Sequence, residues 1–488
     1  MKNNLQYVPP ESLGIPSKAV SGFLNTLHAE GINMHGFMVL RHGKVAAEGY
    51  WAPFKADDNH RMYSISKSFT SVAIGMLIDA GKLTLDSKPA EIFSEYLPEA
   101  PHHYVLEATV EDLLKMATFN SATSYTFTSS DWTETFFTDK GTKHKPGQVF
   151  NYDTAATTVL CAIVEKISGK PILEFMRPVL DVIGFSQDIK CVQTVEGRSW
   201  TGSGILCTHR DLARFALLCM NMGAWNGKQL ISESYMRAAT SKQIDTAFAS
   251  FSGGYGYQFW CLNDGGFAMF GMGGQLALCS PKHAFALITT ADTQHQSEAI
   301  STMVRAYDTL LAQLSDETLP KNIQDCEALN TQIEKLHIAL PHGKKYSPAM
   351  NRMNKTYQLE DNPLNMKWMR VVADENRVTL EYMKNTTNEN TEDVLCSLTF
   401  GLDAYVHQLF PEKYAGLRIG TVDRHYRCIA AGTWLSENTF YGILYSIDDH
   451  LGSIRLQLTF EDDEICGIFT KNAENFFNDY QGFISGKT

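Results

Sequence analysis

The sequence predicts an α+β sandwich, in which an antiparallel sheet is flanked by helices, followed by a second domain that is all-β. Three observations lead to this prediction. Strand patterns lie near both ends of the first 320 residues, at 37–51 and 254–290, with helical patterns between them. After about residue 320 the chain is rich in Pro, Asn and Lys, which is typical of a linker. Beyond residue 350 most segments alternate apolar and polar residues, the pattern of a small barrel or sandwich.

The length of 488 residues also requires more than one core, because an average domain holds about 150 residues. We therefore predict a first domain over residues 1–320, a linker over 321–350 and a β-rich domain over 351–488. The linker prediction rests on composition alone, and the β-rich prediction rests on the two-residue period of its apolar side chains.

Helices of the first domain are predicted where apolar residues recur with a helical period. Two of them begin with a capping box, Thr109 with Asp112 and Thr208 with Asp211. The second box places His209 in the first turn of its helix, where we expect it to face solvent. The segment between the early helices, 119–147, is polar, aromatic and poorly periodic, so we predict a long loop. The predicted helices are 66–80, 109–118, 154–168, 208–222 and 297–314.

The composition and charge of the chain restrict the kinds of partner that the protein can bind. Apolar residues are 44% and charged residues 20% of the chain, an ordinary globular balance. The formal net charge of -12 argues against binding to nucleic acid or an anionic membrane. There is no apolar window of about 18 residues and no secretory leader pattern, so we expect a cytoplasmic protein outside the membrane. The ten cysteines form no C-x-x-C pair and lie mostly in apolar runs, which indicates free thiols in a reducing compartment.

The stretch "RMYSISKSFTS" contains the only S-x-x-K of the chain, Ser64 to Lys67. Ser64 falls at the start of a predicted helix, where unpaired N–H groups and the helix dipole favour a developing negative charge. Lys67 lies three residues later on the same helix face, where an amine can serve as the base of a serine nucleophile. The alternative interpretation is an N-cap serine followed by a solvated lysine.

Tyr152 is a second candidate for proton transfer. It ends a strand-like stretch and precedes the predicted helix at 154–168. A lysine ammonium nearby would lower the pKa of this phenol below its reference value of about 10. Such a tyrosine can relay a proton from the nucleophile to the leaving group. The alternative is a packed aromatic residue at a helix start.

Four segments in order, "YSISKSFTSVAIGMLIDAGKLTLD", "TVEDLLKMAT", "KPGQVFNYDTAATTVLCAIVEKISGKP" and "GSGILCTHRDLARFALLCMNMGAWNGKQLI", resemble the blocks of the serine β-lactamase superfamily. The resemblance covers roughly residues 10–315 and is closest to the class C branch. That branch holds β-lactamases, D,D-peptidases, D-aminopeptidases, esterases and amidases that open aminohexanoate oligomers. The resemblance implies a β-lactamase/D,D-peptidase-like sandwich, with Ser64 as acylated nucleophile, Lys67 as general base and Tyr152 as second acid/base residue. Some relatives also carry a lipocalin-like or barrel tail.

The chain departs from the pattern of this family at two places. Class C β-lactamases and D,D-peptidases resemble one another in a Tyr-x-Asn motif, whereas this chain has Thr154 in place of the asparagine. The Thr154 hydroxyl can still hydrogen-bond Lys67, which is similar to the esterases and amidases. Where the family has Lys-Thr-Gly or His-x-Gly, the chain has Met272 followed by Gly273 and Gly274, and methionine brings no charge to hold a carboxylate. The glycines allow close approach of a substrate, and the N–H of Gln275 would join that of Ser64 as an oxyanion hole. The alternative is a simple turn at the start of a strand.

The loop at 124–141 matches the region that lies over the site in the family. Trp132, Phe136 and Phe137 are therefore expected to form a pocket wall for an apolar acyl or amine group. The alternative is an aromatic loop packed on its own domain.

The sequence therefore predicts a serine hydrolase that cleaves a small ester, amide or peptide through an acyl-enzyme, with no cofactor and no metal. Motifs for other chemistries are absent from the sequence, including HExxH, G-x-S-x-G, the P-loop and GxGxxG. Two alternatives stay open, a β-lactamase or D-amino-acid peptidase, and a non-catalytic binding protein that keeps the fold. The C-terminal domain is a candidate for binding substrate, covering the pocket or mediating oligomers.

Overall fold

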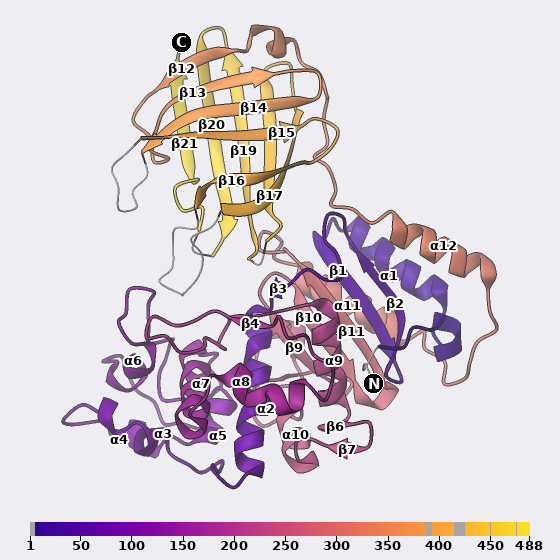
Figure 1. The fold of residues 1–488 in the computed structure, drawn as a ribbon, viewed down its shortest axis with the longest axis vertical. Helices are drawn as coiled ribbons and strands as arrows, with labels where there is room; N and C mark the ends of the chain where they lie inside the picture. Colours follow the sequence, from indigo (N-terminus) through magenta and orange to yellow (C-terminus); the bar gives the residue numbers. More distant parts are fainter. Residues whose placement is uncertain (1–4, 386–392, 414–424, 449, 475) are drawn as a thin grey trace. The chain divides into compact units, whose positions relative to one another are not determined.

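The computed structural model describes residues 5–385, 393–413, 425–448, 450–474 and 476–488, and these form two compact units that divide between His337 and Ile338 (Figure 1). The division lies inside the segment 321–350, for which we predicted a linker. The first part of that segment forms a helix, α12 (Ile323–Glu334), which packs on α1 and β2. Asn322 caps this helix by accepting a hydrogen bond from the Asp325 N–H at 3.1 Å.

An antiparallel sheet built from both ends of the first unit forms its centre, as predicted. Its strand order is β2-β1-β11-β10-β9-β8, so the first hairpin pairs directly with the last strand. The strand β10 is buried at every position and β1 likewise, which explains why both read as continuous apolar runs rather than alternating ones. The strands are β1 (Met34–Arg41), β2 (Lys44–Tyr50), β8 (Trp260–Cys261), β9 (Phe267–Gly271), β10 (Gln275–Ser280) and β11 (Phe285–Ala291).

Helices cover both faces of this sheet. α1 (Ser17–Ala29) packs through Phe23 on Phe37 of β1, with ring centroids 6.1 Å apart. α11 (Ala299–Leu311) packs on the same face, since Phe285, which contacts Tyr307, shares the side of Phe37 by strand register. α9 (His209–Met220) covers the opposite face, where the missing Cβ of Gly36 leaves room for the His209 ring. The result is the predicted sandwich.

The remaining helices form a separate region of the first unit, which Figure 1 shows around α2. They are inserted between β2 and β8, together with two small sheets. The helices are α2 (Ser66–Asp79), α3 (Pro89–Ile92), α4 (His103–Glu107), α5 (Val110–Leu114), α6 (Trp132–Thr138), α7 (Thr154–Ser168), α8 (Ile172–Leu180) and α10 (Glu233–Ala239); the strands are β3 (His60–Arg61), β4 (Lys190–Cys191), β5 (Ile205–Cys207), β6 (Ala224–Trp225) and β7 (Lys228–Gln229).

Two local predictions are wrong. The predicted loop at 119–147 contains α6, which begins where the Asp131 side chain accepts the Glu134 N–H at 2.9 Å. His209 is buried rather than solvent-facing, because the first turn of α9 lies on the sheet and its Nε2 meets the Ile288 carbonyl oxygen at 3.2 Å. Both predicted capping boxes are confirmed, at Thr109 and at Thr208.

The second unit is an all-β barrel, as predicted (Figure 1). Neighbouring strands are antiparallel, except that β15 and β17 form one parallel pair. The inward positions alternate with outward ones, as on β14, where Val378, Leu380 and Tyr382 are buried. The described strands are β12 (Lys355–Leu359), β13 (Met366–Ala373), β14 (Arg377–Asn385), β15 (Asp393–Gly401), β16 (Val406–Lys413), β17 (His425–Trp434), β18 (Thr439–Ser446), β19 (Gly452–Glu461), β20 (Glu464–Ala473) and β21 (Gly482–Lys487).

Side-chain hydrogen bonds supplement the backbone pairing of the strands in this barrel. Between β15 and β16 the Gln408 amide accepts the Thr399 N–H at 3.0 Å and donates to the Thr399 carbonyl oxygen at 2.8 Å, as a paired backbone would. On the inside, Lys384 is 0% exposed and pairs with Glu412 at 3.0 Å and Asp479 at 3.1 Å. A lysine buried in an apolar barrel requires such partners, because an unpaired charge there would be very costly.

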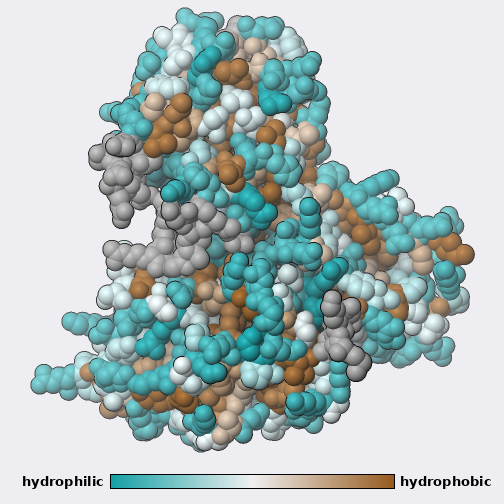
Figure 2. Space-filling view, in the orientation of Figure 1, coloured by the Kyte–Doolittle hydropathy of each residue, from teal (hydrophilic) through white to brown (hydrophobic). Residues whose placement is uncertain are grey.

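The visible surface mixes hydrophilic and hydrophobic residues in small groups (Figure 2). Among the helices of the described residues, we find no candidate for a transmembrane span. All ten cysteines are free thiols.

Candidate active site

Ser64 lies in a 3₁₀ turn, η2 (Tyr63–Ile65), that runs directly into α2. Tyr63 before it has a positive φ of 48°, a conformation that a bulky residue adopts only when its surroundings impose it. Part of this constraint comes from β9, because a Cβ on Gly271 would lie 2.2 Å from the Met62 carbonyl oxygen. The strand and the turn therefore pack backbone against backbone, which holds the turn that carries Ser64.

Lys67 lies next to Ser64, as the S-x-x-K spacing predicted. Its Nζ is 3.1 Å from Ser64 Oγ and donates to the Gly202 carbonyl oxygen at 2.5 Å. It also lies 4.9 Å from the centroid of the Tyr152 ring. The side chain is 1% exposed, so the solvated lysine of the alternative interpretation is not observed. A buried amine that touches a serine hydroxyl is arranged to accept the proton of that hydroxyl.

Tyr152 lines the same pocket as Ser64, and the Ser64 side chain favours its phenolate form. Burial raises the pKa of the phenol above its ordinary value, and the Ser64 side chain only partly offsets this. Our expectation of a lowered pKa is therefore wrong, because the loss of hydration on burial is the largest effect on this phenol. Tyr152 is a neutral phenol here, and a neutral phenol can donate a proton.

Asp153 and Thr154 connect Tyr152 to helix α7. Asp153 is fully buried and caps the helix by accepting the Ala155 N–H at 2.9 Å, and it also accepts the Thr123 hydroxyl at 3.1 Å. Burial raises the pKa of this carboxyl to about 6, although its hydrogen bonds and Lys67 act in the opposite direction. The Thr154 N–H donates to the Thr123 hydroxyl at 3.2 Å. The bond that we predicted from the Thr154 hydroxyl to Lys67 stays a prediction.

The segment 200–205 completes the surroundings of Lys67, and sequence reasoning gave it no role. Its Gly202 supplies the carbonyl oxygen for Lys67, and the buried Arg61 holds the next residue by donating to the Ser203 carbonyl oxygen at 2.7 Å. The Ile205 N–H also donates to Ser66 Oγ at 2.9 Å, which ties the segment to the start of α2. The available signals were the pair of glycines in "TGSG" and the start of the fourth family-like segment at Gly202.

Gln258 fixes the two helices on which the site is built. It is buried, and its side chain accepts the Thr157 hydroxyl of α7 at 2.7 Å while its backbone oxygen accepts the Ser68 hydroxyl of α2 at 2.8 Å. Its φ of 66° is unusual for a residue with a side chain. These hydrogen bonds offset that strain and fix the positions of α2 and α7 relative to each other.

Substitution of Gly202 by alanine is expected to lower the rate at which Ser64 reacts, by at least about tenfold, and to destabilise the fold by about 1–3 kcal/mol. A Cβ at Gly202 would lie 2.6 Å from the Thr154 methyl group, so the carbonyl that holds Lys67 must shift. Fluorophosphonate labelling rates and thermal unfolding would measure both effects. The matched control is Gly22→Ala in α1, where a Cβ meets nothing within 4 Å. Equal labelling rates in the two variants would contradict the expectation.

The turn between β9 and β10 contains Met272, Gly273 and Gly274, and Gln275 is the first residue of β10. The two glycines have φ of 81° and 91°, which residues with a Cβ rarely adopt. The Gln275 side chain pins the turn by donating to the Met272 carbonyl oxygen at 3.0 Å and to the Ala291 carbonyl oxygen at 2.7 Å. The turn is thus rigid, and the backbone N–H of Gln275 stays our prediction for the oxyanion hole.

A pocket of about 610 Å³ opens at Ser64. Met272 lines it, in agreement with its predicted place beside the nucleophile, and aromatic rings supply most of the remaining wall. Trp260 is nearly parallel to Tyr152, with ring centroids 5.6 Å apart, and Phe248 lies 5.0 Å from Trp260. The other lining residues are Phe150, Asn151, Thr246, Ala247 and Phe270.

The aromatic residues predicted as the pocket wall lie elsewhere. Trp132 and Phe136 are both 0% exposed, and neither lines the pocket at Ser64. Trp132 stacks on Tyr125 with centroids 4.1 Å apart, and Phe136 packs on Phe119. The alternative interpretation, an aromatic segment packed on its own domain, describes them, because α6 turns their rings inward. The wall comes instead from 150–152, from 246–248 and from the strands that follow 248.

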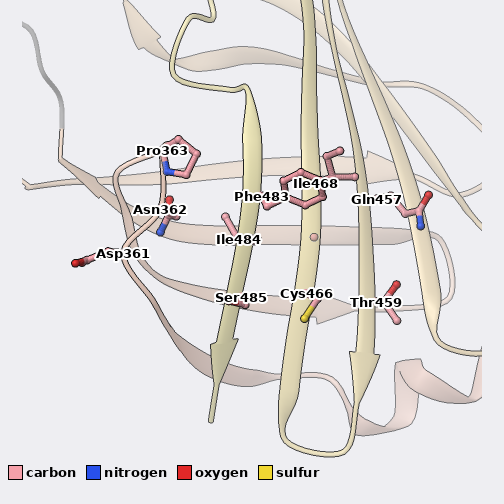
Figure 3. Close-up of a pocket in the computed structure, with 11 residues that line it drawn as sticks. Asp361, Asn362, Pro363, Gln457, Thr459, Cys466, Ile468, Phe483, Ile484 and Ser485 are labelled. Atoms are coloured by element: carbon pink, nitrogen blue, oxygen red, sulfur yellow. The ribbon is translucent and has the colours of Figure 1, made fainter.

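A second pocket, on the barrel, has less catalytic potential. Figure 3 shows it between β19, β20 and β21, with Phe483 close to Ile468 and the Cys466 sulfur nearby. Its described lining contains the nucleophile types Cys466 and Ser485 but neither a lysine nor a histidine that could act as their base. We therefore place the candidate active site at Ser64.

The fold and this site together are those of a serine hydrolase, with Lys67 next to the candidate nucleophile Ser64. The family model described as Beta-lactamase matches residues 24–307, more than half of the chain, and the chain belongs to this family. Its members attack amides or esters through an acyl-enzyme, and this chain is a serine hydrolase of that kind.

Individual relatives agree with this membership. The chain is 27% identical over 313 residues to the 6-aminohexanoate-dimer hydrolase of Paenarthrobacter ureafaciens, covering 56% of this chain and 78% of that one. A penicillin-binding protein homologue from Caulobacter crescentus superimposes with a TM-score of 0.51 at 16% identity, over 61% of this chain and 97% of that one. The hydrolase EstCE1, with promiscuous acyltransferase activity, gives 0.50 at 16% identity, over 62% and 99%. The two structures support the fold.

Proposed function

We propose that this protein hydrolyses small esters or amides through an acyl-enzyme on Ser64, with Lys67 as its general base and Tyr152 as proton donor to the leaving group. The observation that carries the proposal is the 3.1 Å contact between the buried Lys67 Nζ and Ser64 Oγ at the mouth of a pocket. In this proposal the catalytic groups belong to the domain at residues 1–320, joined through 321–350 to the barrel at 351–488.

The reaction begins when Ser64 Oγ attacks the substrate carbonyl carbon and gives its proton to the neutral amine of Lys67. The backbone N–H groups of Ser64 and Gln275 donate to the oxyanion. Tyr152 then protonates the leaving alcohol or amine and regains a proton from Lys67. Water attacks the acyl-enzyme in the second half of the reaction, with the same residues carrying its proton to Ser64.

The pocket favours this reaction over β-lactam or D-amino-acid peptide cleavage. Those substrates present a carboxylate, and Met272, which lines the pocket, cannot pair with it. Turnover of a chromogenic cephalosporin at a rate comparable to that of simple esters would support the alternative activity. The relative named for the 6-aminohexanoate dimer makes linear amides a class to include in the substrate screen.

The test of the proposal is intact-protein mass spectrometry after exposure to a fluorophosphonate. A single adduct that maps to Ser64 and is absent from Ser64→Ala is the expected result. Ser241→Ala, which removes an exposed serine of the same unit, serves as the control and should label like the original protein. An adduct that persists in Ser64→Ala, or no adduct on folded protein, would overturn the assignment.

A further inference from the structure

The pocket at Ser64 offers aromatic surface but no charge. Its described lining residues include no lysine, arginine, histidine, aspartate or glutamate. A carboxylate or ammonium group placed there would lose hydration without gaining an ion pair, which is unfavourable. The pocket thus discriminates by charge as well as by size.

One lining residue is unusually accessible for its type. Phe248 is 39% exposed, although its ring lies 5.0 Å from the Trp260 ring and 6.1 Å from the Phe270 ring. Trp260 is 6% exposed and stacks on Tyr152, so the wall is anchored at its base and open at Phe248. Open apolar surface at the rim of a pocket is typical of a place that a ligand covers.

The position of Tyr152 indicates which part of the substrate this wall receives. Under the proposed function Tyr152 gives a proton to the leaving atom, and its ring is part of the same wall as Trp260. The alcohol or amine that departs must therefore lie along Tyr152 and Trp260. The acyl group, bonded to Ser64, extends away from the proton donor.

We propose that the pocket formed by Tyr152, Phe248, Trp260, Phe270 and Met272 binds the leaving group and selects alcohols or amines that are apolar and uncharged. This inference rests on the proposed function and deepens it. Phe248 is its specificity-determining residue, because its exposed ring must be covered by the leaving group. The substrates are then neutral esters or amides of aromatic or bulky aliphatic alcohols and amines.

The experiment compares two acetate esters of similar size, methyl 4-acetoxybenzoate and 4-acetoxybenzoate, whose leaving groups differ by a methyl group and a negative charge. Each kcat/KM is divided by the rate constant of hydroxide hydrolysis, which corrects for intrinsic reactivity. We expect the neutral ester to be preferred by at least about thirtyfold. A second pair, methyl phenyl adipate and monophenyl adipate, carries the same difference on the acyl side and should show a smaller ratio.

Phe248→Arg should lower the ratio of the corrected kcat/KM for methyl 4-acetoxybenzoate to that for 4-acetoxybenzoate by at least about tenfold, because the guanidinium can pair with the carboxylate. Leu106→Arg is the matched control, since Leu106 is also 39% exposed but lies outside the pocket, and it should keep the ratio. A wild-type ratio within threefold of one, a larger ratio on the acyl side, or an unchanged ratio in Phe248→Arg would overturn the inference. If phenyl acetate is cleaved in a Ser64-dependent way, the proposed function survives that result; if it is not, both fail.

Discussion

Replacement of Lys67 by methionine is expected to lower kcat/KM for an ester by about 10³-fold, within the range that a general base supplies. The amine is 3.1 Å from Ser64 Oγ, and a thioether cannot accept the serine proton at that place. A loss of 10³-fold corresponds to about 4 kcal/mol of transition-state stabilisation. Because Lys67 is almost fully buried, methionine fits the site in size and does not introduce a new buried charge.

The measurement is the steady-state kinetics of phenyl acetate cleavage, together with the rate of fluorophosphonate labelling. Lys82→Met, which changes an exposed lysine after α2, is the control and should retain the original rate. Circular dichroism and thermal unfolding separate loss of chemistry from loss of fold, since the Gly202 carbonyl oxygen loses a donor in Lys67→Met. Activity within about tenfold of the original would show that another group takes the proton.

Acid is expected to destabilise the first unit strongly between pH 6.5 and 4, because three histidines are buried there without charge. Burial lowers the pKa of His60 and of His209 to about 4, and lowers that of His35 well below its ordinary value. Asp58 acts on His60 in the opposite direction, as do the Ile288 carbonyl and Glu48 on His209, without reversing either shift.

The loss of stability in acid follows from the uptake of protons on unfolding. The unfolded chain binds protons at these histidines below about pH 6.5 and the folded chain only near pH 4, so stability present at neutral pH is lost as pH falls. At pH 4.5, His60 and His209 each lower the free energy of unfolding by about 2.5 kcal/mol relative to neutral pH. Asp153 has the opposite effect. Because its pKa is raised to about 6, the folded chain takes up this proton before the unfolded chain does, which raises the free energy of unfolding by about 2 kcal/mol. The net loss from these three groups is about 3 kcal/mol, and His35 adds to it.

Urea unfolding at pH 7.0, 5.5 and 4.5, followed by circular dichroism, would measure this loss. In His60→Phe the tilted ring contact with Phe54, at a centroid distance of 5.1 Å, can persist without a titrating group, so stability should fall less steeply with acid. The exposed His103, changed to Gln, provides the control and should leave the slope unchanged. Equal slopes in His60→Phe and the original chain would show that His60 is not the cause.

The local sequence determined a large part of this fold because its signals act over short distances. Capping boxes at Thr109 and Thr208 satisfy helix N–H groups within three residues, and alternating side chains in 351–488 fix the inward face of each strand. The S-x-x-K spacing placed Lys67 beside Ser64 for the same reason, since residues three apart share a helix face.

Long-range packing decided what the local sequence could not. Gly202 and Phe248 belong to the site only because the chain returns to Ser64 after more than a hundred residues, and no pattern within a segment reports that return. His209 is buried because its helix lies on the sheet, and Trp132 faces inward because α6 replaces the predicted loop. The sequence itself thus determined that the candidate nucleophile Ser64 and Lys67 lie side by side. The groups that hold them, their protonation and the pocket wall depend on burial, which only the tertiary structure defines.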